Sequence, residues 1–365
     1  MAAMLEFRTR GFNPYAVKYS PYYDNRVAVA SAANFGIVGN GRLFALGLTA
    51  AGIEVEKTFD TNDALYDVAW SELNENQILA ACGDGSIKLF DLGVDTYPVM
   101  NYHEHNRETF SVFWNQTAKD TFASSSWDGT VKIWSPTRPH SLRTLPIGSC
   151  TYSAAFSPHN PSVLSAVSSD SRLRVFDLRT PSSAKYHLVS DIPVHQTPGG
   201  RGGAAAQRPQ VPTAAEVLTH DWNKYSPSGV IATGGVDRLV RTFDLRAPHN
   251  GPVAVLAGHE YAVRRLAWSP HAGDVLASAS YDMTVRVWTD GSAMGVGGGT
   301  VGPPDVALKA PVRAGVQLGL MNRHTEFATG VDWCLFGAGG WVASTGWDER
   351  VLLWDANGLL RPGLR

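Results

Sequence analysis

The chain has 365 residues, of which 44% are hydrophobic and 18% charged, and its formal net charge is −2. This composition supplies a sizeable core and excludes a general electrostatic attraction to nucleic acid or to anionic lipid. Because we find no secretory signal, no apolar run of the ~18–20 residues that cross a bilayer, and no metal-ligand spacing among Cys82, Cys150 and Cys334, we expect a soluble intracellular protein without a bound metal or cofactor.

The first predicted element is a short apolar segment, Met4–Thr9, which lies before any repeat. After it one pattern recurs: an alternating segment that ends in an aromatic residue, a small-residue segment that ends at Asp, and an alternating segment that ends in Trp or Phe. Copies of the last two parts occur, in chain order, at Val27–Leu46 (a degenerate copy), Ile78–Phe90, Thr121–Trp134, Ser162–Phe176, Val230–Phe243, Val275–Trp288 and Trp341–Trp354. Alternation with period two predicts half-buried antiparallel strands.

The spacing of these copies predicts a propeller. Four of the six intervals between their last residues are 42 to 45 residues long, which is the ~40–45 residue period of a four-stranded blade. The two longer intervals contain Gly- and Pro-rich segments, residues 196–213 and 290–314, which we interpret as flexible insertions into blades. We therefore predict an all-β, seven-bladed WD40 propeller over residues 1–365. Met4–Thr9 is expected to complete the last blade as its outer strand, because this removes an open sheet edge.

Three blades share a set of His, Ser, Asp and Trp at equivalent positions. The sets are His105, Ser124, Asp128 and Trp134; His259, Ser278, Asp282 and Trp288; and His324, Ser344, Asp348 and Trp354. Ser, His and Asp could form a nucleophile, base and orienting acid. Threefold recurrence instead favours a structural chain of hydrogen bonds from the Trp indole N–H through Ser and His to Asp. His195 is a candidate for a fourth such set, displaced by the insertion that follows it.

Acidic and apolar residues recur where the chain enters each first strand and before each turn Asp. In WD40 propellers these loops share one face, called here the top face. The acidic residues are Asp63, Asp67, Glu108, Glu216, Glu260 and Glu326, and the apolar ones are Leu65, Phe110, Trp127, Tyr281, Phe327 and Trp347. Such a surface fits a helix with one basic and apolar side. Arg264 and Arg265 interrupt the acidic set, and we expect them to orient a carboxylate or to repel a wrong partner.

Several segments resemble a known family, and this resemblance is more specific than the spacing that WD40 repeats have in common. They are Asp63–Glu72 (DALYDVAWSE), His259–Pro270 (HEYAVRRLAWSP), Ser280–Trp288 (SYDMTVRVW) and His324–Trp333 (HTEFATGVDW). With the opening segment (Phe7–Thr9, Ala16–Pro21 and Phe35–Ile37), they are similar to the peroxisomal import receptors for type 2 targeting signals. The resemblance covers the chain except for the two insertions.

This resemblance implies a cargo receptor that cycles between the cytoplasm and the peroxisome. Its ligand would be an N-terminal signal of the form Arg-Leu-x5-His-Leu on peroxisomal matrix proteins. Its partners would be a co-receptor, which is either a separate peroxin of the fungal type or a long form of the type 1 receptor, and the peroxisomal docking complex. Neither nucleic acid binding, membrane insertion nor catalysis is implied. The alternative hypothesis is a WD40 adaptor of another class, such as a substrate-selecting subunit of a ubiquitin ligase or a chromatin scaffold.

Overall fold

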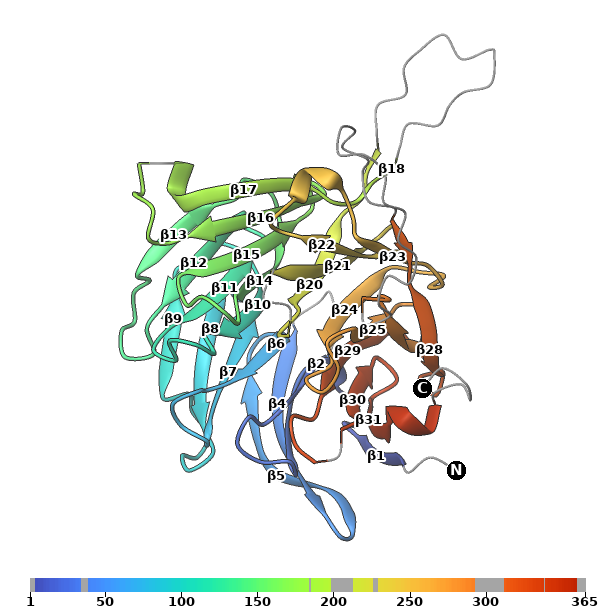
Figure 1. Cartoon of the computed structure of the whole chain (residues 1–365). Helices are drawn as coiled ribbons and strands as arrows, with labels where there is room; N and C mark the ends of the chain where they lie inside the picture. The colour runs from blue at the N-terminus through green and yellow to red at the C-terminus, as the bar shows by residue number, and fades with distance from the viewer. Residues whose placement is uncertain are drawn as a thin grey trace, which may run out of the picture.

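A computed structural model describes residues 4–33, 39–183, 185–197, 213–225, 229–292, 312–337 and 339–359. Its main elements are seven antiparallel sheets fanned around a common centre, so the predicted seven-bladed propeller is confirmed (Figure 1). The first strands of successive blades contact one another in order, and the first strand of the seventh blade contacts that of the first. The innermost strands therefore form a closed ring.

Blades 1 to 6 are meanders that run from an inner to an outer strand, and in blade 7 the N-terminal strand takes the outer place. The strands are, for blade 1, β2 (Asn13–Tyr19), β3 (Arg26–Ala33), β4 (Asn40–Thr49) and β5 (Gly52–Thr61); for blade 2, β6 (Leu65–Trp70), β7 (Gln77–Cys82), β8 (Ser86–Asp91) and β9 (Met100–His103); for blade 3, β10 (Thr109–Trp114), β11 (Phe122–Ser126), β12 (Thr130–Trp134) and β13 (Arg143–Pro146); and for blade 4, β14 (Thr151–Phe156), β15 (Val163–Ser168), β16 (Arg172–Asp177) and β17 (Leu188–Pro193).

The remaining blades follow the same order. Their strands are, for blade 5, β20 (Val217–Trp222), β21 (Val230–Gly235), β22 (Val240–Asp244) and β23 (Ala254–Leu256); for blade 6, β24 (Val263–Trp268), β25 (Val275–Ser280), β26 (Val285–Thr289) and β28 (Val316–Met321); and for blade 7, β29 (Ala328–Trp333), β30 (Trp341–Gly346), β31 (Arg350–Asp355) and β1 (Met4–Arg8). Short 3₁₀ turns occur at Lys185–His187, Pro248–Asn250 and Ala356–Leu359. Within the described ranges no helix is long and apolar enough to cross a membrane.

The N-terminal strand closes the ring as predicted. β1 pairs antiparallel with β31, from Met4 opposite Trp354 to Arg8 opposite Arg350. Leu5 and Phe7 pack against a core cluster that blades 1 and 7 share. The chain thus covers the edge of β31 with its own beginning, which stabilises the last blade.

Tryptophans at the ends of the first strands join neighbouring blades. The indole Nε1 of Trp70 donates to the carbonyl oxygen of Lys18 in the preceding blade at 3.0 Å. Trp268 and Trp333 make the same bond to Asp221 and Ala267 at 3.2 and 2.9 Å. Each ring therefore buries a large apolar surface between blades and still satisfies its polar atom.

The two predicted insertions are described only at their ends. At the first, β18 (Gln196–Thr197) pairs antiparallel with β19 (Thr213–Ala214) between blades 4 and 5. At the second, β27 (Arg313–Ala314) pairs parallel with β23, so the chain passes the outer edge of blade 5 before it forms β28 of blade 6. The parts of both segments between these strands, and Phe35–Ile37 of the family resemblance, lie outside the described residues.

Candidate functional site

Every first strand carries a β-bulge at the same position. The bulged residue is the fourth before the aromatic that ends the strand, and the register shifts around it in all seven blades. A bulge leaves one residue outside the ladder and redirects its side chain. The seven bulged residues are Tyr15, Tyr66, Phe110, Tyr152, Leu218, Arg264 and Thr329.

Six of these bulged side chains, all except Thr329, line one cavity of about 880 Å³ at the mouth of the central channel. The rest of the wall comes mainly from loops that enter the first strands or precede the turn Asp. Of the residues predicted from the sequence, the cavity brings together Asp63, Glu108, Glu216, Phe110, Trp127, Tyr281 and Trp347. We call this cavity the top pocket.

Aromatic rings form a continuous belt around much of the pocket. Starting in blade 6, ring centroids lie 4.9 Å apart between Tyr281 and Phe327, and 5.3 Å between Phe327 and Trp347. The belt continues from Trp347 to Tyr15 at 5.5 Å, from Tyr15 to Tyr66 at 5.3 Å, and from Tyr66 to Phe110 at 5.2 Å. Phe110 stacks on Trp127 at 5.2 Å. Such a wall offers a large apolar contact area whose rings already hold one another in place.

Three carboxylates stand in this aromatic wall. Glu216 accepts a hydrogen bond from the Tyr152 hydroxyl at 2.8 Å, and the Asp63 carboxylate accepts one from the Ala64 backbone N–H at 2.7 Å. Glu108 has one loose ion pair, with Arg107 at 3.6 Å. Burial, with the nearby Asp63 and Glu108 charges, raises the pKa of Tyr66 to about 12. The tyrosine hydroxyl therefore stays protonated as a donor at neutral pH.

Two predicted contact residues are not at the surface. Asp67 has a side chain that is only 4% exposed, and its carboxylate lies 2.6 Å from the Arg265 guanidinium of blade 6, so it pairs across the channel. Leu65 is fully buried. The bulge at Tyr66 is the reason: it turns the tyrosine into the pocket while its two neighbours keep their places in the core.

Two further predicted residues lie beside the top pocket and not in its wall. Glu326 is exposed, and Phe327 reaches the aromatic belt through its contacts with Tyr281 and Trp347. The residues that the sequence interpretation missed are Tyr15, Tyr66, Tyr152 and Leu218. Their constant distance from the first-strand aromatic is a signal that could have identified them.

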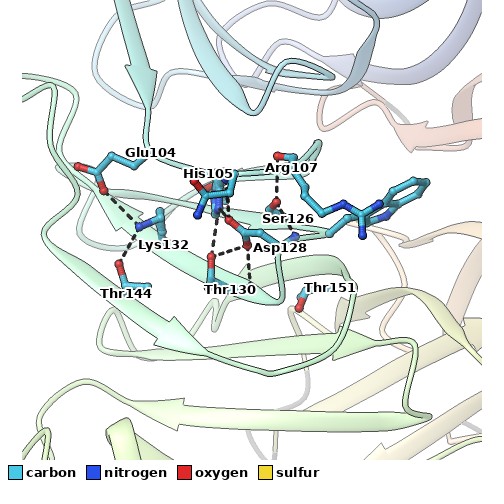
Figure 2. A network of polar contacts seen from close by, with 12 residues as sticks. Glu104, His105, Arg107, Ser126, Asp128, Thr130, Lys132, Thr144 and Thr151 are labelled. Carbon is cyan, nitrogen blue, oxygen red and sulfur yellow. Dashed lines mark hydrogen bonds and ion pairs between the residues drawn. The ribbon is translucent and has the colours of Figure 1, made fainter.

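The His, Ser, Asp and Trp sets form hydrogen-bonded chains inside the blades. In blade 3, His105 Nδ1 lies 2.9 Å from Asp128, His105 Nε2 lies 2.8 Å from Ser124, and the Trp134 indole donates to Ser124 Oγ at 2.9 Å. Figure 2 shows His105 above Asp128 and Thr130 in this chain. Blades 6 and 7 repeat it through His259, Ser278, Asp282 and Trp288, and through His324, Ser344, Asp348 and Trp354.

A fourth chain occurs in blade 5, with His195 at its centre. Its Nδ1 lies 2.7 Å from Asp237 and its Nε2 lies 2.9 Å from the Thr233 hydroxyl. The serines of the other three chains are 0% exposed, and each accepts the indole N–H of its Trp. Within the described part of the chain, no cluster of His, Cys, Asp or Glu could hold a metal ion.

Comparison with known proteins places this sequence in a family. The WD domain, G-beta repeat model matches residues 54–91, 97–135, 140–177 and 250–289. The chain is 37% identical to the peroxisomal targeting signal 2 receptor of Saccharomyces cerevisiae, over 97% of this chain and 100% of the relative. It is 40% identical to the receptor of that name from Komagataella phaffii, over 98% and 100%, and 37% identical to the Mus musculus receptor over the full length of both.

Proposed function

The chain belongs to the family of peroxisomal targeting signal 2 receptors, and we propose that its top pocket binds the N-terminal type 2 signal of peroxisomal matrix proteins. The observation that carries this proposal is the aromatic belt with three carboxylates set into it. A signal of the form Arg-Leu-x5-His-Leu, folded as a helix, presents Arg, His and leucines along one side. Its apolar side would cover the rings while its basic groups face Asp63, Glu108 and Glu216.

We expect apolar contact to contribute more to the affinity for the signal than the ion pairs do. Exposed ion pairs contribute only about 0.2–1 kcal/mol each, and Glu108 and Glu216 are both partly or fully exposed. A short helix laid on one open face also leaves its other side in water. We therefore propose that a co-receptor peroxin covers the signal, that the loaded complex docks at the peroxisomal membrane, and that the receptor cycles between cytoplasm and peroxisome without catalysing a reaction.

The experiment is fluorescence anisotropy of a labelled type 2 signal peptide with the purified chain, alone and with the co-receptor. We expect weak binding to the chain alone and much tighter binding in the ternary mixture. Equal affinity in the two mixtures would contradict the proposal that the co-receptor covers the bound signal and strengthens its binding. A peptide without the signal pattern that competes equally well would favour an adaptor of another class.

Substitution of one pocket carboxylate tests whether the signal binds in the top pocket. Glu108→Lys places a positive charge among the groups proposed to face the basic side of the signal, so signal binding should weaken. The thermal midpoint should stay unchanged because the pair that Glu108 makes with Arg107 is loose, at 3.6 Å. Glu326→Lys is the matched control, since Glu326 is exposed outside the pocket wall. A lowered midpoint in Glu108→Lys would show that this side chain is structural.

A further inference from the structure

Arg264 is a buried cation in the wall of the top pocket. The residue is only 3% exposed, yet its side chain lines the cavity. Its Nη2 atom is buried without a hydrogen-bond partner, and no carboxylate in the described residues lies within ion-pair distance of its guanidinium. Burial lowers the pKa of Arg264 from its ordinary value, which shows how poorly the site solvates the cation. A buried charged donor without an acceptor is costly to the folded state.

The neighbouring residues leave this donor free for a ligand. Arg265, the next residue, bonds both oxygens of Asp67, so this buried carboxylate is already paired. The Arg264 guanidinium lies over the Phe110 ring at 4.6 Å from its centroid. A ring face stabilises a cation without accepting its N–H groups along their own directions, so the hydrogen-bonding capacity stays unused.

We propose that Arg264 forms a carboxylate-binding subsite in the wall of the top pocket, among Tyr15, Phe110 and Tyr281. Guanidinium groups recognise carboxylates by paired, charge-assisted hydrogen bonds, and the surrounding rings bury the apolar part of the ligand. The pocket thus selects a ligand with two signs of charge: basic groups toward Asp63, Glu108 and Glu216, and one carboxylate toward Arg264. This assignment deepens the proposed function and rests on it where the carboxylate is taken to belong to the signal-bearing polypeptide.

The subsite itself is tested with phenylacetate, a small aryl carboxylate, against phenylacetamide, its neutral counterpart of nearly equal shape. Ligand-observed NMR titration of the full chain should show phenylacetate binding about tenfold more tightly than the amide. Arg264→Gln should remove that difference, and Arg264→Lys should keep part of it. Arg246→Gln, at an exposed arginine on blade 5, is the control and should behave like the unaltered chain. Equal binding of acid and amide would overturn the proposal.

The thermal stability of the Arg264 variant tests the proposal independently of ligand binding. Because Arg264 has no hydrogen-bond or ion-pair partner among the described residues, Arg264→Gln should leave the thermal midpoint unchanged or raise it. A variant that fails to fold, or melts clearly lower, would show a structural role and overturn the proposal.

The signal-bearing ligand is tested separately by anisotropy. Five labelled signal peptides each carry one Glu at a different x position and are compared with their Gln versions. At one or more positions, Glu should strengthen binding to the unaltered chain and have no effect on Arg264→Gln. Tight binding of all peptides without any such dependence would refute the subsite's role in signal binding and leave the receptor function standing. Absence of binding by every peptide would refute the receptor function, while the phenylacetate result would still decide the subsite.

Discussion

Single hydrogen-bonding residues hold the blades of this propeller in shape. In blade 3, Ser124 stands between the Trp134 indole and His105, and it is fully buried. Its hydroxyl donates to one neighbour and accepts from the other, so one atom satisfies two buried groups. A residue in this position stabilises the fold far more than its size suggests.

Ser124→Ala should therefore lower the free energy of unfolding by about 1–3 kcal/mol, because it leaves the indole N–H and the imidazole without partners in a dry interior. Ser135→Ala is the control, since the hydrogen bond between that hydroxyl and Thr137 lies at an exposed site. Urea unfolding of both variants measures the difference. Equal loss in the two variants would contradict the structural role of the chain.

Buried histidine also makes stability depend on pH. Burial lowers the pKa of His220 to about 3, so between pH 6.5 and 3 the unfolded chain binds a proton at this imidazole that the folded chain does not. The free energy of unfolding should thus fall as the pH drops below about 6.5, by about 2 kcal/mol at pH 5 from this group alone. His220→Gln should flatten urea midpoints measured from pH 7 to 5, whereas His140→Gln, at an exposed side chain, should not.

Protonation of buried carboxylates causes a second loss of stability, at lower pH. Burial alone would raise the pKa of Asp237, but hydrogen bonds from His195 and Arg241, with the Arg241 charge, outweigh it and hold the pKa at about 2. Stability from this group is present above about pH 4 and is lost as the pH falls toward 2. The urea midpoint should consequently decline in two stages as the pH falls, first from His220 and then from Asp237. A decline that occurs only below pH 4 would contradict the conclusion that the buried histidines are neutral in the folded chain.

At the scale of the element, β1 is the strand on which closure depends. Leu5 and Phe7 face the shared core of blades 1 and 7, and the Phe7 ring centroid lies 6.0 Å from that of Phe44. Glu6 points the other way and pairs with the partly exposed Arg8. One face of this strand therefore closes the ring, and the other meets solvent.

Phe7→Ala should lower stability by about 1–3 kcal/mol, because a half-buried ring leaves a partial cavity. Glu6→Ala should change it by less than about 1 kcal/mol. Thermal unfolding of the full chain, with size-exclusion chromatography to detect association through the bared edge of β31, measures both. A Glu6→Ala loss as large as that of Phe7→Ala would refute this role of the strand.

The elements could be predicted from the sequence because each blade repeats the period-two pattern at nearly constant spacing. The pocket could be predicted only in part. The loops that enter the first strands suggested Leu65 and Asp67, whereas the bulge directs Tyr66, which lies between them, into the pocket wall. A bulge depends on how a strand pairs with its partner, so period-two alternation within one blade does not show it, and only alignment of the blades on their first-strand aromatics points to the shared position. The pairing of Arg265 with Asp67 across the channel was hidden for the same reason, since 198 residues separate the two.

At the scale of the whole molecule, the closed ring brings residues of different blades together into one site. Six blades contribute their bulged residue, loops from most blades add further lining residues, and no blade forms a pocket alone. Closure gathers six bulged side chains around one cavity, and sequence divergence among blades decides their chemistry. Aromatic residues occupy four positions, while blade 6 supplies Arg264. The site is therefore a property of the closed ring and should be lost with it.

The most direct test of this account is a reciprocal charge exchange measured by anisotropy. Glu108→Lys combined with Glu216→Lys should weaken binding of the type 2 signal peptide about tenfold, as expected for losing two partly exposed ion pairs and adding repulsion. A peptide whose Arg and His are both replaced by Glu should bind this double variant better than it binds the unaltered chain. The pair Glu260→Lys and Glu326→Lys, on the same face outside the pocket wall, should not give that rescue. If the exchanged peptide gains nothing from the double variant, or gains as much from the control pair, the top pocket is not where the signal binds.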